Sequence, residues 1–415
     1  MIYEGDNKIV DKCHGASPSM LRRRISLLKR IPLQKLSPIR SVKPLRTNHR
    51  KIELTEIAPA LGDSVSNRKL SIWRFLQVLI WLVGMFIWSA LIFSPKLGLH
   101  LLWNVLIPVA PALFVLAPGV WRNVCPLGSF SLIPHHFGFS ARRELSSVWR
   151  GRLFLAAFLL LMLVVPLRKV LLDTNGHVLA VILAVVGLLA FGMGTFFNRK
   201  SGWCSSLCPV YPVELLYGSQ PLVTVQNSHC PDCVHCVRPC SESSEGLSPQ
   251  TAVVTDLAKN IGILFTGIFP GFIWGWYNVT TYSGWEGFRH LKQAFGIPYA
   301  AGAVTLLVYL VLRKVWPKQK QTVSHIFAAS AIITYYWFRL PPVFGIGDPD
   351  AAMIVDISES IPAWSAMALQ IFTVVTFSWL MVIRTGKRHP WEVHPPNSIQ
   401  SNAHSVGDRH RLPIV

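Results

Sequence analysis

Long apolar stretches constrain this chain more than any other feature. A helix needs about 20 consecutive apolar residues to cross a bilayer, because each residue advances it by only about 1.5 Å. Eight stretches of roughly that length alternate with polar segments. They lie at residues 72–93, 98–120, 153–172, 177–197, 260–279, 297–316, 323–340 and 361–383. The sequence therefore predicts an all-α, polytopic transmembrane protein with about eight spans.

The composition agrees with a membrane protein. Only 14% of the residues are charged, whereas soluble domains carry about 25%. Fifteen tryptophans fit the aromatic belts that lie at the two membrane interfaces. No cleavable signal peptide is recognisable, because the basic first 71 residues contain no short apolar core. Membrane lipid is therefore the first partner that the sequence predicts.

The net charge of +20 raises the question of nucleic-acid binding, which the distribution of the charge answers. If the N-terminus is cytoplasmic, 32 Lys and Arg residues fall in segments on that side and 5 in the opposite loops. This bias is the positive-inside rule. The acidic loop at 341–360 has no basic residue and falls outside. We expect a bacterial inner-membrane protein with both termini in the cytoplasm, and we expect no nucleic-acid partner.

This topology divides the chain into five segments. They are a basic, disordered tail at 1–71, four helices at 72–197 with Cys125 in a loop between them, a cytoplasmic segment at 198–256, four helices at 257–383 and a second tail at 384–415.

A run of four cysteines lies in the cytoplasmic segment. Cys230, Cys233, Cys236 and Cys240 have the spacing C-x₂-C-x₂-C-x₃-C. Bacterial ferredoxins hold a [4Fe–4S] cluster with this spacing. Zinc is the alternative, but zinc sites usually pair two short cysteine couples across a longer spacer. The run therefore predicts a small ferredoxin-like iron–sulfur loop on the cytoplasmic face.

Three further cysteines lie at the same face. Cys125 follows the second span, and Cys204 and Cys208 follow the fourth; Cys125 and Cys208 each precede a proline. Disulfides are rare in the reducing cytoplasm, so we expect thiols. As a set, these residues are candidate ligands of a second [4Fe–4S] cluster, which makes seven candidate ligands in all.

These motifs resemble the membrane-bound polyferredoxin family. That family includes the quinol-dehydrogenase subunit of periplasmic nitrate reductase systems and the C-terminal half of the nitrous-oxide-reduction regulator. Its members carry a pair of C-x₃-C-P elements on cytoplasmic loops and a ferredoxin-like segment after the second. Cys204-Ser-Ser-Leu-Cys208-Pro matches one such element, and the four-cysteine run matches one ferredoxin segment. The resemblance covers roughly residues 75–245.

The chain departs from the family pattern as a divergent member. Trp121 stands where the first C-x₃-C-P element would begin, only one ferredoxin run is present, and Ser241 replaces the usual proline after Cys240. Seven cysteines leave one of two clusters a ligand short. The open position is expected to take another side chain of this chain, water or a substrate. The candidate side chains are Cys13, His135, His136, His229 and His235.

The histidines near the spans argue against haem. Haem b needs paired histidines from facing helices, but His100 and His177 lie near outer span ends, His325 begins the seventh span, and no span holds two.

Three cations lie within or beside spans. Arg74 and Lys259 are close enough to the surface to snorkel. Arg339 is a candidate to contact a quinone head group or the acidic outer loop.

The function that these features predict is electron transfer. We expect a relay through [4Fe–4S] clusters between a quinone pool, or a cytoplasmic donor, and a partner redox protein, as in a quinol-dehydrogenase component. One alternative is an accessory or sensing protein for maturation or regulation of another membrane complex. Another is an enzyme whose open iron binds substrate.

Overall fold

The computed structural model describes residues 67–143, 145–197, 202–223, 225, 228, 255–282, 284–346, 353–360, 362 and 364–384. These residues are mainly helical, and no strand occurs among them. Their one isolated β-bridge joins Arg143 and Phe197. The predicted all-α class is confirmed for this part of the chain.

Seven helical segments in the described residues are long and apolar enough to cross a membrane. They are Leu70–Phe93, Pro95–Leu116, Ser147–Leu172, Gly176–Phe196, Asp256–Tyr277, Gly287–Val315 and Ser365–Ile383. The chain is thus a multi-pass membrane protein. The second segment ends earlier than its predicted limit at residue 120, because Ala117 leaves the helical conformation (φ −154°, ψ 71°) and Pro118 starts a new helix.

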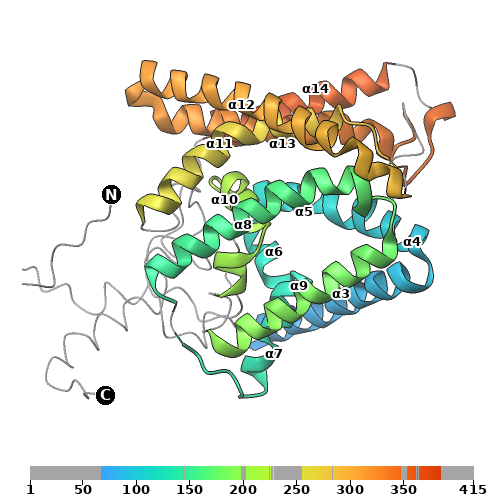
Figure 1. Cartoon of the computed structure of the whole chain (residues 1–415), viewed down its shortest axis with the longest axis vertical. Helices are drawn as coiled ribbons and strands as arrows, with labels where there is room; N and C mark the ends of the chain where they lie inside the picture. The colour runs from blue at the N-terminus through green and yellow to red at the C-terminus, as the bar shows by residue number, and fades with distance from the viewer. Residues whose placement is uncertain are drawn as a thin grey trace, which may run out of the picture. The chain divides into compact units, whose positions relative to one another are not determined.

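The predicted span at 323–340 corresponds to helix α13 (Lys320–Val343), which is not among those seven. At 24 residues α13 is long enough to cross a bilayer, but polar side chains, including His325 and Arg339, lower its mean hydropathy. It packs against α11 (Asp256–Tyr277) and α14 (Ser365–Ser378) (Figure 1).

Two groups of helices make up the bundle. In the first, α3 (Asn67–Phe93) packs along α9 (Gly176–Phe196), and α7 (Pro126–His136) packs against both (Figure 1). In the second, α11 packs against α12 (Leu291–Val315), α13 and α8 (Ser147–Leu167).

Three of the seven spans contain or continue into π-helical turns, and short helical elements lie between the spans. The π-helical turns are η1 (Leu101–Leu106), between α4 (Pro95–His100) and α5 (Ile107–Leu116), η2 (Arg168–Leu172) after α8, and η9 (Trp379–Ile383) after α14. The short elements are α6 (Pro118–Val124), η3 (Trp203–Leu207), α10 (Tyr211–Tyr217), η5 (Gly284–His290), η6 (Pro317–Gln319) and η8 (Ser358–Ser360).

Helix α11 is the centre of the bundle. Within its apolar stretch 67% of the residues are buried, against 17–33% for the other six segments. Phe265 and Phe272 are fully buried there. Gly275 permits close contact with α12, since a Cβ at Gly275 would lie 2.6 Å from the Cα of Pro298. Small residues at such a contact let helix backbones approach one another in a membrane.

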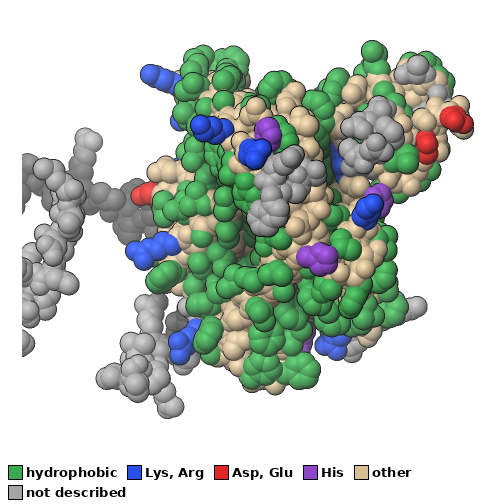
Figure 2. Space-filling view, turned by 45° about the vertical axis from the view of Figure 1, so that its right-hand side comes forward, with side chains coloured by type: hydrophobic (Ala, Val, Ile, Leu, Met, Phe, Trp, Pro, Cys, Tyr) green, Lys and Arg blue, Asp and Glu red, His purple; other side chains and the backbone are tan. Residues whose placement is uncertain are grey.

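The outer faces of the helices carry many apolar side chains. Phe86 of α3, Leu188 of α9 and Leu307 of α12 are 59%, 68% and 64% exposed. Figure 2 shows a face that is largely hydrophobic, with charged side chains sparse and scattered. Exposed apolar patches of this extent mark membrane contact, so these faces are suited to contact lipid tails.

Candidate metal centre

The two Cys-Pro elements have the same local geometry. Cys125 ends α6 and is the N-cap of α7, with φ −53° and ψ 124°. Cys208 ends η3 ahead of α10, with φ −60° and ψ 123°. A proline excludes the helical conformation at the residue before it but is well suited to start a helix. Each element therefore places a cysteine at a sharp junction between two helical turns.

A backbone hydrogen bond fixes each cysteine to a tryptophan one turn earlier. The N–H of Cys125 donates to the carbonyl of Trp121 at 2.8 Å, and that of Cys208 donates to the carbonyl of Trp203 at 2.9 Å. The second turn is one residue wider because η3 is π-helical. π-Turns often occur at functional sites. Similar junctions thus follow α5 and α9, two helices far apart in sequence.

The sulfurs of Cys125 and Cys204 both lie close to Gly128. A Cβ built at Gly128 would stand 3.4 Å from Sγ of Cys204 and 3.8 Å from Sγ of Cys125. Both sulfurs are therefore close to one point on α7 where no side chain intervenes. The structure brings together these two predicted site residues, which are 79 positions apart in the sequence.

Cys208 is partly buried near the same group. Burial raises the pKa of the Cys208 thiol, and the neighbouring Cys125 and Glu214 raise it further. The cause is the cost of an anion in a poorly solvated place beside other acidic groups. A thiolate at Cys208 is therefore favoured only when a cation or a metal cluster balances it. The three described cysteines form no disulfide with one another.

A buried ion pair joins the two Cys-Pro elements. Arg122, three residues before Cys125, donates through Nε to Oε1 of Glu214 in α10. The two side chains are only 6% and 10% exposed. Breaking a buried pair by removing one partner leaves an uncompensated charge, which is strongly destabilising. The pair therefore fixes the α6–α7 junction against α10.

Asn123 connects this region to Ser228, a residue shortly before the four-cysteine run in the sequence. Its Oδ1 accepts hydrogen bonds from both N and Oγ of Ser228, each at 2.8 Å. Gln77 of α3 donates to the same Oγ at 3.2 Å. Asn123 and Ser228 are 1% and 3% exposed. Cys230 follows Ser228 by two residues; the run itself, with Cys233, Cys236 and Cys240, lies outside the described residues.

No three His, Cys, Asp or Glu side chains in the described part of the chain are grouped closely enough to hold a metal ion alone. His135 is engaged through Nε2, which is 3.1 Å from the carbonyl oxygen of Phe197. His136 is exposed at the end of α7. The other candidates for the open position, Cys13, His229 and His235, lie outside the described residues.

Trp121, at the position where the family resemblance leads one to expect a cysteine, packs into the core. Its ring meets that of Phe114 edge-on, with centroids 5.4 Å apart. The same core cluster includes Cys208 at its margin. At this position the side chain therefore makes an aromatic contact in the apolar core, where a large ring gains from burial.

The other polar residues noted in the sequence are dispersed. Arg74 and Lys259 are exposed, in agreement with snorkelling. Nδ1 of His100 lies 3.0 Å from Nδ2 of Asn104, and Nδ1 of His325 lies 3.1 Å from Nε2 of Gln220. Arg339 is part-buried among helix ends on the side away from the cysteines.

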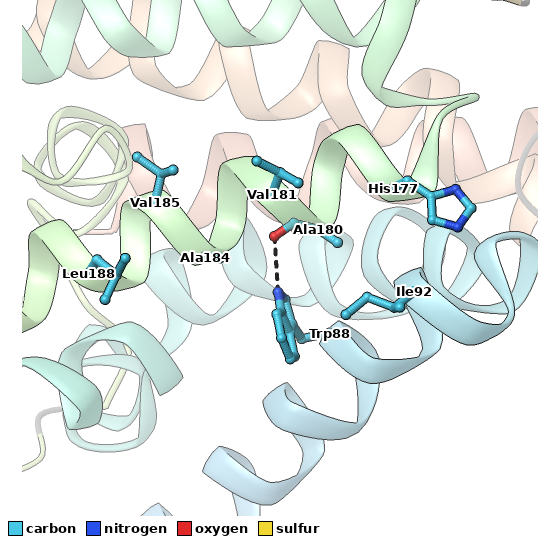
Figure 3. A pocket seen from close by; sticks show the side chains of 8 residues that line it. All are labelled: Trp88, Ile92, His177, Ala180, Val181, Ala184, Val185 and Leu188. Carbon is cyan, nitrogen blue, oxygen red and sulfur yellow. Dashed lines mark hydrogen bonds between the residues drawn. The ribbon is translucent and has the colours of Figure 1, made fainter.

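An apolar groove between α3 and α9 encloses about 380 Å³. His177 lies at one end of it and Leu188 at the other, and Trp88 bridges the helices by donating to the carbonyl of Ala180 at 3.0 Å (Figure 3). The lining is otherwise aliphatic. Because the residues that line this groove present few polar atoms, the groove is suited to contact with hydrocarbon chains.

Sequence reasoning missed the residues that hold the cysteines in place. They are Arg122, Asn123, Gly128, Glu214 and Ser228. In the sequence, Arg122 contributes only to the positive-inside bias, and Glu214 belongs to no motif. The available signal for a buried pair was an isolated carboxylate, six residues after Cys208, in an otherwise apolar stretch.

Comparison with known proteins identified no relative of this chain. The chain matches no protein-family model, no curated protein and no solved structure.

Proposed function

We propose that this chain is a membrane electron-transfer protein that holds two [4Fe–4S] clusters on one face of its bundle. The clusters would relay electrons between a quinone pool, or a cytoplasmic donor, and a partner redox protein. When bound, such clusters supply one-electron redox chemistry. The seven candidate ligands are Cys125, Cys204, Cys208, Cys230, Cys233, Cys236 and Cys240.

The convergence of two distant cysteines at Gly128 carries this proposal. Cys125 and Cys204 lie close to one point, and Asn123 holds Ser228 beside the same junction. Cys230 follows Ser228 by only two residues in the sequence. On this proposal, thiols from three chain segments would share one small volume, as cluster ligation requires.

The surrounding residues suit thiolate ligands. The environment of Cys208 disfavours an isolated thiolate, so ligation by iron would be the state that ionises it. Arg122 neutralises Glu214 and so limits the negative charge beside the sulfurs. Trp203, the neighbour of Cys204 in the sequence, is itself buried at 3% exposure.

We also propose the finer topology. Helix α13 would be an eighth span whose polar side chains are accommodated by packing against α11 and α14. The cysteines and both termini would face the cytoplasm of a bacterial cell, according to the positive-inside bias.

A second candidate is an accessory or sensing protein. Trp121, packed against Phe114, leaves seven clustered cysteines for two clusters. A cluster with three thiolates and an open iron is labile toward oxygen. That lability would suit a role in maturation or regulation of another membrane complex rather than steady turnover.

Iron and acid-labile sulfide analysis of the purified full chain, with potentiometric EPR, tests the proposal. We expect two [4Fe–4S] signals in the wild type and loss of one in Cys125→Ser. Ser129→Ala, on the same helix, is the matched control and should keep both. Zinc without sulfide in the wild type would overturn the proposal.

Reduction by a quinol separates the two candidates. Reversible reduction of both signals at a matching potential supports the relay. Loss of the clusters in oxygen, with no electron transfer from quinol under anaerobic conditions, supports the sensing role.

A further inference from the structure

A second polar cluster lies at the end of the bundle away from the cysteines. Arg168 of η2 lies between two indole rings, with its Cζ 3.7 Å from the ring centroid of Trp103 and 4.8 Å from that of Trp276. Nζ of Lys169 lies 4.6 Å from the centroid of Trp276. Two adjacent cations thus contact the ring of one tryptophan, an arrangement that cation–π attraction supports.

Arg339 of α13 completes this cation–aromatic cluster. Its Nη2 donates to the carbonyl of Trp103 at 2.7 Å and to Oδ1 of Asn104 at 2.6 Å. Lys169 has Arg168 and Arg339 among its charged neighbours. Three cations from two helices therefore belong to one electrostatic group.

The positive charge of the cluster is not balanced by described carboxylates. Asp173 accepts from Nε of Arg168 at 2.9 Å and is the one carboxylate among the charged neighbours of Lys169. Asp356 in the nearby acidic loop accepts instead from N and Oγ of Ser358. Three cations and one carboxylate leave two positive charges in excess.

Two buried donors in the cluster have no acceptor within the described part of the chain. They are Nε1 of Trp276, a residue only 6% exposed, and Nε of Arg339. Leaving a buried N–H without a partner is costly, and each such group in a folded protein calls for an explanation. Both are donors, so the group that would satisfy them is an acceptor.

The local backbone also indicates a specialised site. Trp103 and Asn104 lie in the π-turn η1, and Arg168 and Lys169 lie in the π-turn η2. π-Turns are rare and often mark functional sites. Only five Lys and Arg residues lie in the loops that are expected on the outer side. Two of them, Arg168 and Lys169, belong to this cluster, and the positive-inside bias does not explain their presence.

We propose that the cation–aromatic cluster binds a phosphate group, either in the head group of an anionic phospholipid or as free phosphate. Guanidinium groups and phosphate oxygens make strong charge-assisted hydrogen bonds. A phosphate supplies both the missing acceptors and the missing negative charge, whereas a neutral quinone head group would supply acceptors alone. Basic pockets between transmembrane helices recognise lipid head groups, and tryptophans lie at head-group depth. The side chains of Arg168 and Asp173 keep 12% and 16% exposure, which leaves an approach.

Binding to the wild-type full chain in detergent is the first test. Phosphatidylglycerol, diacylglycerol and inorganic phosphate would each be titrated, with native mass spectrometry and the thermal midpoint as readouts. Binding of phosphatidylglycerol that millimolar phosphate does not reproduce assigns the site to lipid. Stabilisation by phosphate alone, with competition against the lipid, assigns it to the free ion. Equal binding of phosphatidylglycerol and diacylglycerol, with no effect of phosphate, overturns the proposal.

Two variants locate the site. Trp276→Phe keeps the ring and removes the N–H donor, and we expect about tenfold weaker binding from the loss of one charge-assisted hydrogen bond. Trp274→Phe, at a half-exposed position on the same helix, is the control and should bind as the wild type does.

Arg339→Gln should weaken binding further. If Trp276→Phe and Arg339→Gln both fold and retain wild-type affinity, the site is not this cluster. Iron content is read separately, so this result is independent of the electron-transfer proposal.

Discussion

Asn123 and Ser228 are joined by two hydrogen bonds across 105 residues of sequence. One amide oxygen of Asn123 accepts from the backbone N–H and from the hydroxyl of Ser228 in a buried position. This contact ties Ser228, which precedes the four-cysteine run by two residues in the sequence, to the junction that presents Cys125.

We expect Asn123→Ala to lower the iron content and the thermal midpoint. The substitution leaves two buried donors of Ser228 without their acceptor, at about 1–3 kcal/mol for each unsatisfied group. Ser228→Ala keeps the backbone bond and should have a smaller effect. Iron analysis and thermal unfolding of both variants check this order. An Asn123→Ala protein with the iron content and midpoint of the wild type would show that the contact has no part in holding the run.

Gly128→Ala distinguishes a cluster site from thiols that merely pack together. The added methyl would make ordinary contacts of 3.4 Å and 3.8 Å with the sulfurs, and alanine is the better helix former by about 1 kcal/mol. In iron-free protein the variant should therefore be as stable as the wild type or more so. If iron and sulfide occupy the space between the sulfurs, the same methyl should lower cluster occupancy. Gly192→Ala, where a Cβ meets no atom within 4 Å, is the control and should keep full occupancy.

Much of the fold follows from hydropathy, because a helix in lipid must satisfy its own backbone groups and shield them with apolar side chains. The main difference concerns α13, which is not among the seven apolar segments because polar side chains such as Arg339 lower its mean hydropathy. A second difference is that Ala117 and Pro118 end the second span before its apolar run is finished. Hydropathy alone does not detect that helix break.

The grouping of Cys125 with Cys204 was expected, since both follow spans that end on the same face. Their approach to Gly128 depends on the packing of α7 against η3, which no local pattern encodes. The Arg122–Glu214 pair likewise arises only when α6 meets α10. The four-cysteine run stays a prediction, because it lies outside the described residues.

The Arg122–Glu214 pair gives a stability prediction. Glu214→Gln leaves a guanidinium buried without its counter-ion, and we expect a loss of about 3–5 kcal/mol in unfolding free energy. The double variant Arg122→Met, Glu214→Leu removes both charges and should be less destabilised than the single variant. Denaturant unfolding in detergent compares them. Equal losses in the two proteins would mean that the pair's charges are solvated.

Alkylation of iron-free protein tests the environment of Cys208. Its pKa is raised, so the thiol stays protonated at pH 8 and should react slowly with iodoacetamide, with the rate rising only at more alkaline pH. Cys125→Ser removes one of the groups that raise this pKa, so the rate profile should move toward lower pH. Cys204→Ser is the matched control with no expected shift. Peptide mapping by mass spectrometry measures the alkylation of Cys208 separately from that of the other cysteines. If Cys125→Ser leaves the dependence of this rate on pH unchanged, the two thiols do not interact electrostatically.

Reporter fusions decide whether α13 crosses the membrane. Gln319 precedes α13 and Asp356 follows it, and both are exposed. If α13 spans, green fluorescent protein fused after Gln319 should fluoresce, because it folds in the cytoplasm, and alkaline phosphatase fused after Asp356 should be active, because it requires the outer compartment. A phosphatase fusion in the turn after Asp173, between two of the seven apolar segments, serves as the outside control. Should both test positions report the same side, α13 lies along the bundle without crossing, and the acidic loop shares a compartment with the cysteines.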